Sequence, residues 1–286
     1  MKTVNLILVL ATVTLAAVSC GPKKENKKEE TPKEEAPKML VLYYSQTSNT
    51  KMVAQEIATR LDADIEEIVA VNPYDGDFKE TIERSAQERE QGITPEIQPI
   101  HADIAQYDII FIGFPVWFGT YAPPVATFLD QVDLSGKKIV PFCTFGSGGL
   151  ESSVQDLIDA QPNAKVLAGY GVRAARLDAA PKEIDQFLKA GGFIEGEYIQ
   201  PDEFSELHPV SAEEAAIFDA ATGDYPMMHA KAEFVGSRAI PGGTEYLFIA
   251  VDLPRKDMPN MPPAGEMKVY VNVVEGETPV FTRVVR

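Results

Sequence analysis

Six consecutive polar residues near the start of the folded part of the chain suit phosphate binding. They are Ser45, Gln46, Thr47, Ser48, Asn49 and Thr50. The apolar run 39–44 precedes them, and a helical pattern of apolar residues follows directly. A loop between a strand and the first turn of a helix presents free backbone N–H groups at the positive end of the helix dipole. Side-chain hydroxyl and amide groups beside these N–H groups predict a phosphate site without a cation, and an ordinary helix N-cap is the alternative.

Two further apolar runs end in loops of unusual composition. The run 107–113 leads into an aromatic, proline-rich loop that holds the single tryptophan, and the run 138–144 leads into a glycine-rich loop. The candidate ligand contacts in these loops are Pro115, Val116, Trp117, Phe118, Gly119, Thr144, Phe145, Gly146, Gly148 and Gly149. In an open parallel sheet, ligands bind beyond the carboxyl ends of the strands, where the strand order reverses. The three loops together predict a pocket for a flat aromatic ligand that carries a phosphate. For Trp117 the alternative is a role in packing alone.

The elements that must position these loops alternate between strand and helix, which is typical of a parallel sheet. Strands are expected at 39–44, 64–69, 107–113, 138–144 and 164–170, and helices near 50–61, 123–130, 150–160 and 181–190. The longer segment 72–99 keeps helical spacing at Phe78, Ile82 and Ala86. Right-handed crossovers predict an α/β fold with a doubly wound, five-stranded parallel sheet of order 2-1-3-4-5.

The segment from about Met39 to Ile194 resembles the flavodoxin family. Tyr44-Ser-Gln-Thr-Ser-Asn-Thr50 is similar to the flavin-phosphate loop of that family, and the segments 113–119 and 144–149 are similar to its second and third loops. The resemblance implies a flavodoxin-like fold that binds FMN, with Trp117 and its neighbours against the isoalloxazine ring. Ser48 stands where the family usually has glycine, a residue that adopts positive φ without strain. We therefore expect weakened binding of FMN, with an empty, degenerate pocket as the alternative.

The first 20 residues have the features of a secretion signal. Lys2 precedes the apolar run 6–18, which is too short for a convincing membrane span, and small residues lead to Cys20. This pattern resembles a bacterial lipoprotein signal, which implies a lipidated Cys20, membrane attachment through it and a place in the bacterial cell envelope outside the cytoplasm. Cleavage by ordinary signal peptidase is the alternative. Residues 21–38 are rich in Lys, Glu and Pro, and we expect them to form a disordered tether.

The charge balance and the scarcity of cysteine exclude several classes of function. The chain has 26 Lys and Arg against 43 Asp and Glu, which argues against nucleic acid as a partner because phosphate contacts need a basic face. The two cysteines allow no disulfide framework, and Cys143, within an apolar run, is expected to be an inert core residue. His101, His208 and His229 lack the spacing of zinc ligands, so no metal site is expected. No residue stands out as a catalytic group.

Residues 201–286 have a different pattern. Ser211 and Glu214 match a capping box that begins a short helix, and strands are expected at 230–240, 244–252, 267–274 and 279–285. One helix followed by a four-stranded meander predicts an α+β domain that resembles the cystatin-like fold. Arg238 stands where cystatins have a glutamine in their inhibitory hairpin. A role in docking a partner is therefore expected in preference to protease inhibition.

These features predict four segments and a redox function. The segments are a lipoprotein signal (1–20), a tether (21–38), a flavodoxin-like FMN-binding domain (39–200) and a cystatin-like domain (201–286). The bound FMN would exchange electrons with a partner protein or a small-molecule acceptor. The alternative is a cell-surface binding scaffold without cofactor, since a fold does not fix a function. Inhibition of a cysteine protease is a third hypothesis.

Overall fold

The computed structural model describes residues 36–223, 225, 228–254 and 265–286. The chain divides into two units, Met1–Ala36 and Pro37–Arg286, and the second unit contains every helix and strand given below. The predicted signal, Cys20 and most of the predicted tether lie outside the described residues. Within the described part, no helix has the length and hydropathy that crossing a membrane requires.

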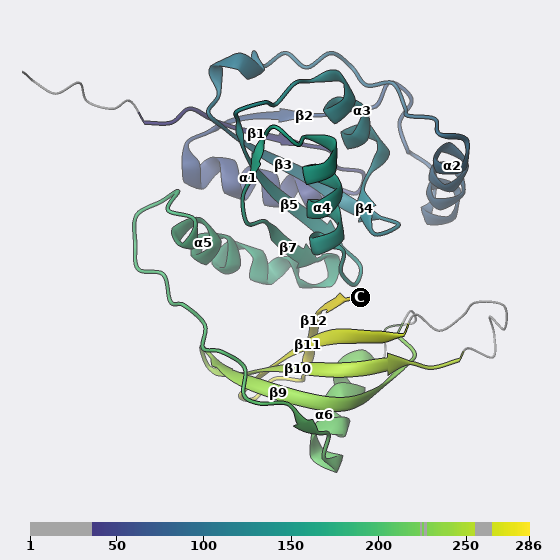
Figure 1. Cartoon of the computed structure of the whole chain (residues 1–286), viewed down its shortest axis with the longest axis vertical. Helices are drawn as coiled ribbons and strands as arrows, with labels where there is room; N and C mark the ends of the chain where they lie inside the picture. Colours follow the sequence, from purple (N-terminus) through teal and green to yellow (C-terminus); the bar gives the residue numbers. More distant parts are fainter. Residues whose placement is uncertain (1–35, 224, 226–227, 255–264) are drawn as a thin grey trace, which may run out of the picture. The chain divides into compact units, whose positions relative to one another are not determined.

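The first half of Pro37–Arg286 is a parallel sheet with helices on both faces (Figure 1). Its parallel strands are β1 (Met39–Tyr43), β2 (Asp64–Glu67), β3 (Ile109–Trp117), β5 (Lys138–Phe145), β6 (Lys165–Val166) and β7 (Tyr170–Arg173). The order is β2-β1-β3-β5, and β6 and β7 both pair with β5. The predicted order 2-1-3-4-5 is confirmed, and the predicted fifth strand is divided into two short pieces.

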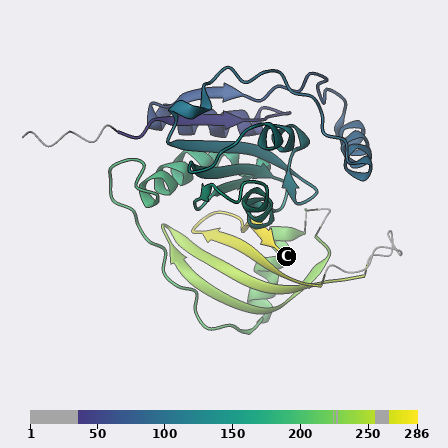
Figure 2. The ribbon, with the colours of Figure 1, turned by 45° about the horizontal axis from the view of Figure 1, so that its top comes forward.

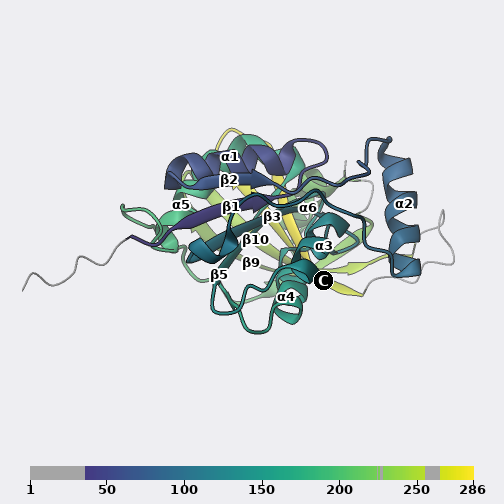
Figure 3. The same ribbon diagram turned by 90° about the horizontal axis from the view of Figure 1, so that it is seen from above.

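Helices cover this sheet on both sides, as Figure 3 shows for α1 against α3 and α4. The helices α1 (Asn49–Leu61) and α5 (Ala180–Ala190) pack on one face, and α3 (Pro123–Gln131) and α4 (Leu150–Ala160) pack on the other. Alternate residues of β1 enter the two cores, Val41 on the side of α1 and Leu42 on the side of α3. Because both faces are buried, these strands have no polar side, which explains their continuous apolar runs.

The segment between β2 and β3 contains the helix α2 (Phe78–Gln91), as its helical spacing predicts. Asp77 and Glu80 form a capping box at its start, and Gly92 ends it with φ of 64°. A short 3₁₀ turn, Ile104–Gln106, follows before β3. The capping box stabilises α2 locally, because each side chain binds a backbone N–H group that the helix itself leaves free.

The structure corrects the predicted loop around Trp117. The strand β3 continues four residues beyond the predicted end at Gly113 and pairs with β4 (Thr120–Tyr121) in a hairpin. Phe118 and Gly119 make the turn with φ of 52° and 81°, the combination of a type I′ turn, whose twist matches that of paired strands. Trp117 is therefore the last residue of a strand. The sequence pattern missed this because Pro115 has no N–H to donate to a neighbouring strand, which argues against the continuation of a central strand.

The C-terminal part is an antiparallel sheet with one helix on a single face, visible in light green to yellow in Figure 2. Its elements are β8 (His208–Pro209), α6 (Ala212–Thr222), β9 (Ala230–Ile240), β10 (Gly243–Asp252), β11 (Glu266–Val274) and β12 (Val280–Val285). Phe218 of α6 packs on Phe248 and the other apolar side chains of the sheet. The predicted helix, its capping box and the four long strands are confirmed, and β8 is an addition. The likeness to cystatins remains a prediction.

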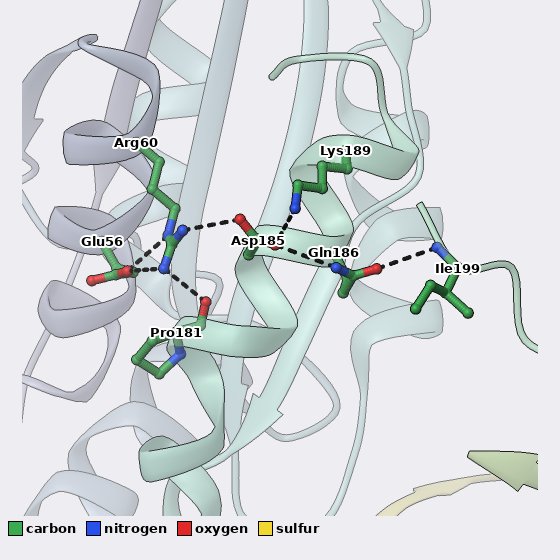
Figure 4. A network of polar contacts seen from close by, with 7 residues as sticks. All are labelled: Glu56, Arg60, Pro181, Asp185, Gln186, Lys189 and Ile199. Atoms are coloured by element: carbon green, nitrogen blue, oxygen red, sulfur yellow. Dashed lines mark hydrogen bonds and ion pairs between the residues drawn. The ribbon is translucent and has the colours of Figure 1, made fainter. Parts of the chain in front are cut away.

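An arginine near the end of α1 ties this helix to α5 (Figure 4). The guanidinium of Arg60 binds Glu56 within α1 at 2.7 Å, and it reaches Asp185 at 3.2 Å and the carbonyl oxygen of Pro181 at 3.0 Å in α5. Lys189 also binds Asp185, at 2.8 Å. Since the side chain of Arg60 is only 29% exposed, these contacts are partly shielded from water.

The substitution Arg60→Ala is expected to lower the free energy of unfolding by about 1–2 kcal/mol, because it removes partly buried hydrogen bonds to a charged group. Urea unfolding followed by circular dichroism measures this loss. Lys79→Ala is the control, since Lys79 is 81% exposed and its ion pair among the described residues is with Glu83 on the same helix. It is expected to change stability by less than about 0.5 kcal/mol. Equal losses in the two variants would contradict the role of Arg60.

Candidate functional site

The three predicted cofactor loops meet at the carboxyl ends of β1, β3 and β5. The hydroxyl of Thr50, in the first loop, lies 2.9 Å from the hydroxyl of Thr144, at the end of β5. The ring of Trp117 lies 6.0 Å from that of Tyr44, centroid to centroid, which joins the second loop to the first. The hydroxyl of Ser152 in α4 donates to the carbonyl oxygen of Gly119 at 2.5 Å, so the second and third loops are also adjacent. Residues from three distant parts of the sequence therefore surround one site.

The first loop presents backbone N–H groups that no side chain of the loop blocks. Ser48 is the N-cap of α1 with φ of 67° and ψ of −4°, and its hydroxyl makes no capping hydrogen bond. The N–H of Lys51 donates to Ser45 Oγ at 3.2 Å, and the N–H of Met52 donates to the carbonyl oxygen of Ser48. Within the part of the chain that the structure describes, the N–H groups of residues 48–50 have no acceptor. They form a positively polarised cradle at the helix N-terminus.

The side chains of this loop have different surroundings. Thr47 and Ser48 are exposed, whereas Thr50 is 1% exposed and its hydroxyl is paired with Thr144. Gln46 points to α2 and the segment before it, where its side-chain amide donates to the carbonyl oxygen of Tyr74 at 3.1 Å and to Thr81 Oγ1 of α2 at 2.8 Å. Gln46 and Thr50 thus hold the loop in place. The exposed hydroxyls and the free N–H groups are the atoms that can meet a phosphate.

The lysine that directly follows this loop is already paired. Lys51 in the first turn of α1 forms an ion pair with Glu67 at 3.2 Å. Its ammonium group is therefore held at the end of β2. A phosphate at this loop would depend on neutral donors and on the helix dipole, as the sequence predicts.

An aromatic cluster stands beside the first loop, and sequence reasoning recognised only one of its members. Trp117 packs edge-to-face on Tyr74, with ring centroids 5.1 Å apart, and also on Tyr44. Arg84 of α2 stacks over Tyr74 at 3.8 Å, and the hydroxyl of Tyr74 donates to Glu88. Trp117 thus packs within this cluster, and its contact with a flavin ring stays a prediction. The positions of Tyr44 and Tyr74 could have identified them as members of this cluster, since each lies beside a predicted loop or turn.

The phenols near the site hold their protons more tightly than free tyrosine. Burial, followed by the carboxylates of Asp156, Asp130 and Asp159, raises the pKa of Tyr121 from 10.0 to about 12. Burial raises the pKa of Tyr44, and burial with the hydrogen bond to Glu88 raises that of Tyr74. At neutral pH these side chains are uncharged, so they add no negative charge beside a phosphate.

These raised pKa values predict a loss of stability in alkali. A phenol with a higher pKa in the folded state contributes stability that is fully present below its unfolded pKa of about 10 and is lost as the pH rises through its folded value. The free energy of unfolding is therefore expected to fall between about pH 10 and pH 12, the latter being the pKa of Tyr121. Urea unfolding at a series of pH values measures the slope. Tyr121→Phe should make the slope shallower, and an unchanged slope would contradict this assignment.

The third loop contains glycines for reasons of packing. Gly149 is the N-cap of α4 with φ of 111°, and a Cβ there would lie 2.6 Å from the side chain of Val116. A Cβ on Gly148 would overlap the carbonyl oxygen of Val284 in β12. The structure therefore explains Gly148 by the close approach of β12, independently of any cofactor.

A cavity of about 500 Å³ lies beside the β3–β4 hairpin. The hairpin lines it with Trp117, Phe118 and Tyr121, and α2 and α4 contribute Arg89 and Asp156. None of the residues 45–50 or 144–149 line it. The cavity is therefore separate from the phosphate loop.

Other reactive groups in the described residues are inert or isolated. Cys143 is fully buried, and burial raises the pKa of its thiol, which agrees with its predicted role as an inert core residue. His101 and His208 each contact one glutamate at the surface. Within the described residues, no group of three or more His, Cys, Asp or Glu side chains could hold a metal ion.

The comparisons with known proteins agree with this fold. The family model of flavodoxin matches residues 38–184, about half of the chain, and the chain belongs to the flavodoxin family. A curated relative, NAD(P)H dehydrogenase (quinone) 3 of Rhizobium meliloti, is 34% identical over 126 residues, which are 41% of this chain and 58% of the relative. The chain thus spans little more than half the length of this relative.

Solved structures of flavoproteins also match about half of the chain. A protein described as a flavoprotein, from Bacteroides eggerthii, is 27% identical with a TM-score of 0.49, and the match covers 54% of this chain and 98% of the other. A flavoprotein from Lactobacillus acidophilus in complex with FMN is 29% identical with a TM-score of 0.44, and the match covers 48% of this chain and 93% of the other. Both matches involve about half of the present chain.

Proposed function

We propose that this protein is a redox flavoprotein that binds FMN at the three loops and passes electrons to or from a small-molecule acceptor or a partner protein. The observation that carries the proposal is the convergence of the three loops around an unblocked helix N-terminus. Membership of the flavodoxin family and the relative that binds FMN support this choice of cofactor.

The residues present fit the phosphate of FMN. The N–H groups of residues 48–50 lie free at the start of α1, and the exposed hydroxyls of Thr47 and Ser48 stand beside them. The serine at position 48 adopts the left-handed conformation that a glycine would provide, so the backbone of the loop has the required shape. Its hydroxyl makes no bond to the helix, and an anion can therefore approach the N–H groups.

Each loop has a distinct task in this proposal. The first loop would bind the phosphate through uncharged donors. The hairpin residues 115–119 would flank the isoalloxazine ring, and the backbone N–H groups of the third loop would donate hydrogen bonds to the polar edge of that ring. Bound FMN would supply the one- or two-electron chemistry, and the protein tunes and orients it. The cavity beside Phe118 is next to the hairpin and would admit a small acceptor. The name of the curated relative supports a quinone as the chemical class of this acceptor.

The direct test is to purify the protein and record its visible spectrum. A yellow protein with flavin absorbance, or a thermal shift on addition of FMN to colourless protein, is the expected result. Oxidation of NADH or NADPH with a quinone as acceptor then tests the activity. A colourless protein that shows neither a thermal shift nor flavin binding would overturn the proposal.

The lipid anchor belongs to the same proposal. Small residues before Cys20 support lipidation at this cysteine, attachment to the membrane and a place in the bacterial cell envelope outside the cytoplasm. Mass spectrometry of the N-terminal peptide tests the modification. The variant Cys20→Ala is expected to release the protein from the membrane fraction, and its retention there would contradict the anchor.

A scaffold without cofactor is the second candidate, and Ser48 is the observation that favours it. Its positive φ is a conformation that L-residues other than Asn and Asp seldom adopt, and it costs roughly 1 kcal/mol. Ser48 occupies a position where the family usually has glycine. Such a replacement is expected at a site that is no longer required to bind FMN tightly. The cystatin-like domain would then provide the docking surface for a partner.

The substitution Ser48→Gly separates the two candidates. Glycine adopts the same φ without strain, and we expect FMN to bind roughly three- to ten-fold more tightly because the backbone can approach the phosphate. Titration of flavin fluorescence measures the affinity. Asp62→Gly is the control, since Asp62 has φ of 50° at the other end of α1. A scaffold would bind no FMN with either residue at position 48.

A further inference from the structure

An arginine at the end of β7 connects the third cofactor loop to the C-terminal sheet. The Nε of Arg173 donates to the carbonyl oxygen of Gly146 at 2.8 Å, and Nη1 donates to the carbonyl oxygen of Phe281 in β12, also at 2.8 Å. The guanidinium lies 4.2 Å from the ring centroid of Phe281 and 5.2 Å from that of Tyr225. One side chain thus holds a carbonyl group of the loop and a strand of the C-terminal domain.

A second contact joins the same two segments without Arg173. The backbone N–H of Val284 donates to the carbonyl oxygen of Ser147 at 2.7 Å, and Gly148 pairs with Val284 in a parallel bridge. The absence of a side chain at Gly148 is what permits this approach, because a Cβ would overlap the carbonyl oxygen of Val284. Val284 is itself 3% exposed and belongs to the core of the C-terminal sheet. The loop is therefore attached to a firmly packed strand.

These contacts use the carbonyl groups of the loop and leave its donors free. Gly146 and Ser147 have their carbonyl oxygens occupied, by Arg173 and Val284 respectively. Within the part of the chain that the structure describes, the N–H groups of Ser147 and Gly148 have no acceptor. A peptide group fixed by its carbonyl oxygen has a fixed N–H direction, because the peptide unit is planar.

We propose that the C-terminal domain, acting through Arg173 and the N–H of Val284, fixes the orientation of the third loop and so presents the N–H groups of Ser147 and Gly148 to the cofactor. Arg173 is a positioning residue in this scheme, and the C-terminal domain is a structural part of the cofactor site. The inference rests on the proposed function for the identity of the ligand. The coupling between the loop and β12 does not depend on it.

Arginine suits this role for chemical reasons. Its planar guanidinium has five N–H donors, so it can bind two carbonyl groups from different segments and still stack on aromatic rings. Arg173 is half-buried, and burial lowers the pKa of its guanidinium, yet the group stays charged at neutral pH. Lysine could not reproduce this geometry.

The test uses the full-length protein and two variants that break the coupling in different ways. Arg173→Ala removes the side-chain link, and Val284→Pro removes the N–H that binds Ser147. Hydrogen exchange measured by mass spectrometry on the peptide that contains the Ser153 N–H, which donates to the carbonyl oxygen of Gly149 at 3.0 Å and so reports on the loop, is expected to be faster in both without added FMN. The dissociation constant of FMN is expected to rise roughly three- to ten-fold, the effect of losing a hydrogen bond between neutral groups.

Matched controls separate this effect from general destabilisation. Arg176→Ala removes an equally charged residue three positions on, whose partner is Glu183. Val285→Ala shortens the neighbouring side chain of β12 and leaves every backbone N–H of the strand in place. Both controls are expected to leave the exchange of the loop and the affinity for FMN close to those of wild type.

The outcomes distinguish this inference from the proposed function. Loop exchange at the wild-type rate in both Arg173→Ala and Val284→Pro would overturn the coupling. Faster exchange with an unchanged affinity for FMN would overturn the positioning role of Arg173. A wild-type protein that binds no FMN would overturn the proposed function, and the exchange rates alone would then decide whether the C-terminal domain fixes the loop.

Discussion

Replacement of Asn49 by aspartate is expected to weaken FMN binding by at least about 100-fold while the protein stays folded, because two like charges about 4 Å apart repel by several kcal/mol near a protein surface. Asn49 is the first residue of α1, beside the free N–H groups of the phosphate loop. The change from amide to carboxylate preserves shape and adds one negative charge. Titration of flavin fluorescence gives the dissociation constant.

Asn49→Asp is expected to weaken FMN binding but to stabilise the folded protein in the absence of FMN. A carboxylate in the first turn of a helix interacts favourably with the helix dipole, so the cofactor-free protein should be more stable by about 0.3–1 kcal/mol. Urea unfolding without FMN measures this gain. A general loss of structure cannot produce weaker FMN binding together with a higher free energy of unfolding. The two effects observed together would therefore identify a phosphate site.

Gln55→Glu is the matched control, since it makes the same chemical change on an exposed position of α1, almost two turns further on. It is expected to change the affinity for FMN less than about three-fold, because an exposed charge at this distance is largely screened by salt. If Asn49→Asp bound FMN as tightly as wild type, the phosphate of the ligand would have to lie elsewhere.

The substitution Gly113→Ala is expected to lower the free energy of unfolding by about 3 kcal/mol, the upper range for overpacking a core. Gly113 lies within β3 opposite Phe142 of β5, whose ring is fully buried. A Cβ on Gly113 would overlap that ring, and neither strand can move, because each is paired on both sides. Urea unfolding without FMN measures the loss.

A double-mutant cycle tests the stated cause. Phe142→Leu alone should cost about 1 kcal/mol, because it leaves a small cavity. In the double variant the smaller leucine makes room for the new methyl group, so the total loss should be less than the sum of the two by at least about 1 kcal/mol. Additive losses would show that the cost of Gly113→Ala has another origin.

The sequence by itself determined the parallel sheet, its order and the nature of the phosphate loop. The reason is that these features have local causes. Strands buried on both faces are apolar throughout, helices on their faces repeat every three to four residues, and right-handed crossovers leave one order. The polar run 45–50 was recognisable because a helix N-terminus imposes its chemistry on a few adjacent residues. The C-terminal meander was equally predictable, since its capping box and turns are local signals.

Only the tertiary structure decided which partners these residues have. Tyr44 and Tyr74 join Trp117 from separate segments, and Thr50 pairs with Thr144 across the end of β3. The hairpin around Phe118 was hidden, since Pro115 suggested that the strand had ended.

The glycines show the same division most clearly. A glycine in a sequence indicates that space or positive φ is needed, but it does not indicate which group takes the space. Gly113 is required by the ring of Phe142, and Gly148 by the carbonyl of Val284, more than a hundred residues further along the chain. Contacts between distant segments depend on how the helices and strands pack, so the local sequence patterns do not predict them.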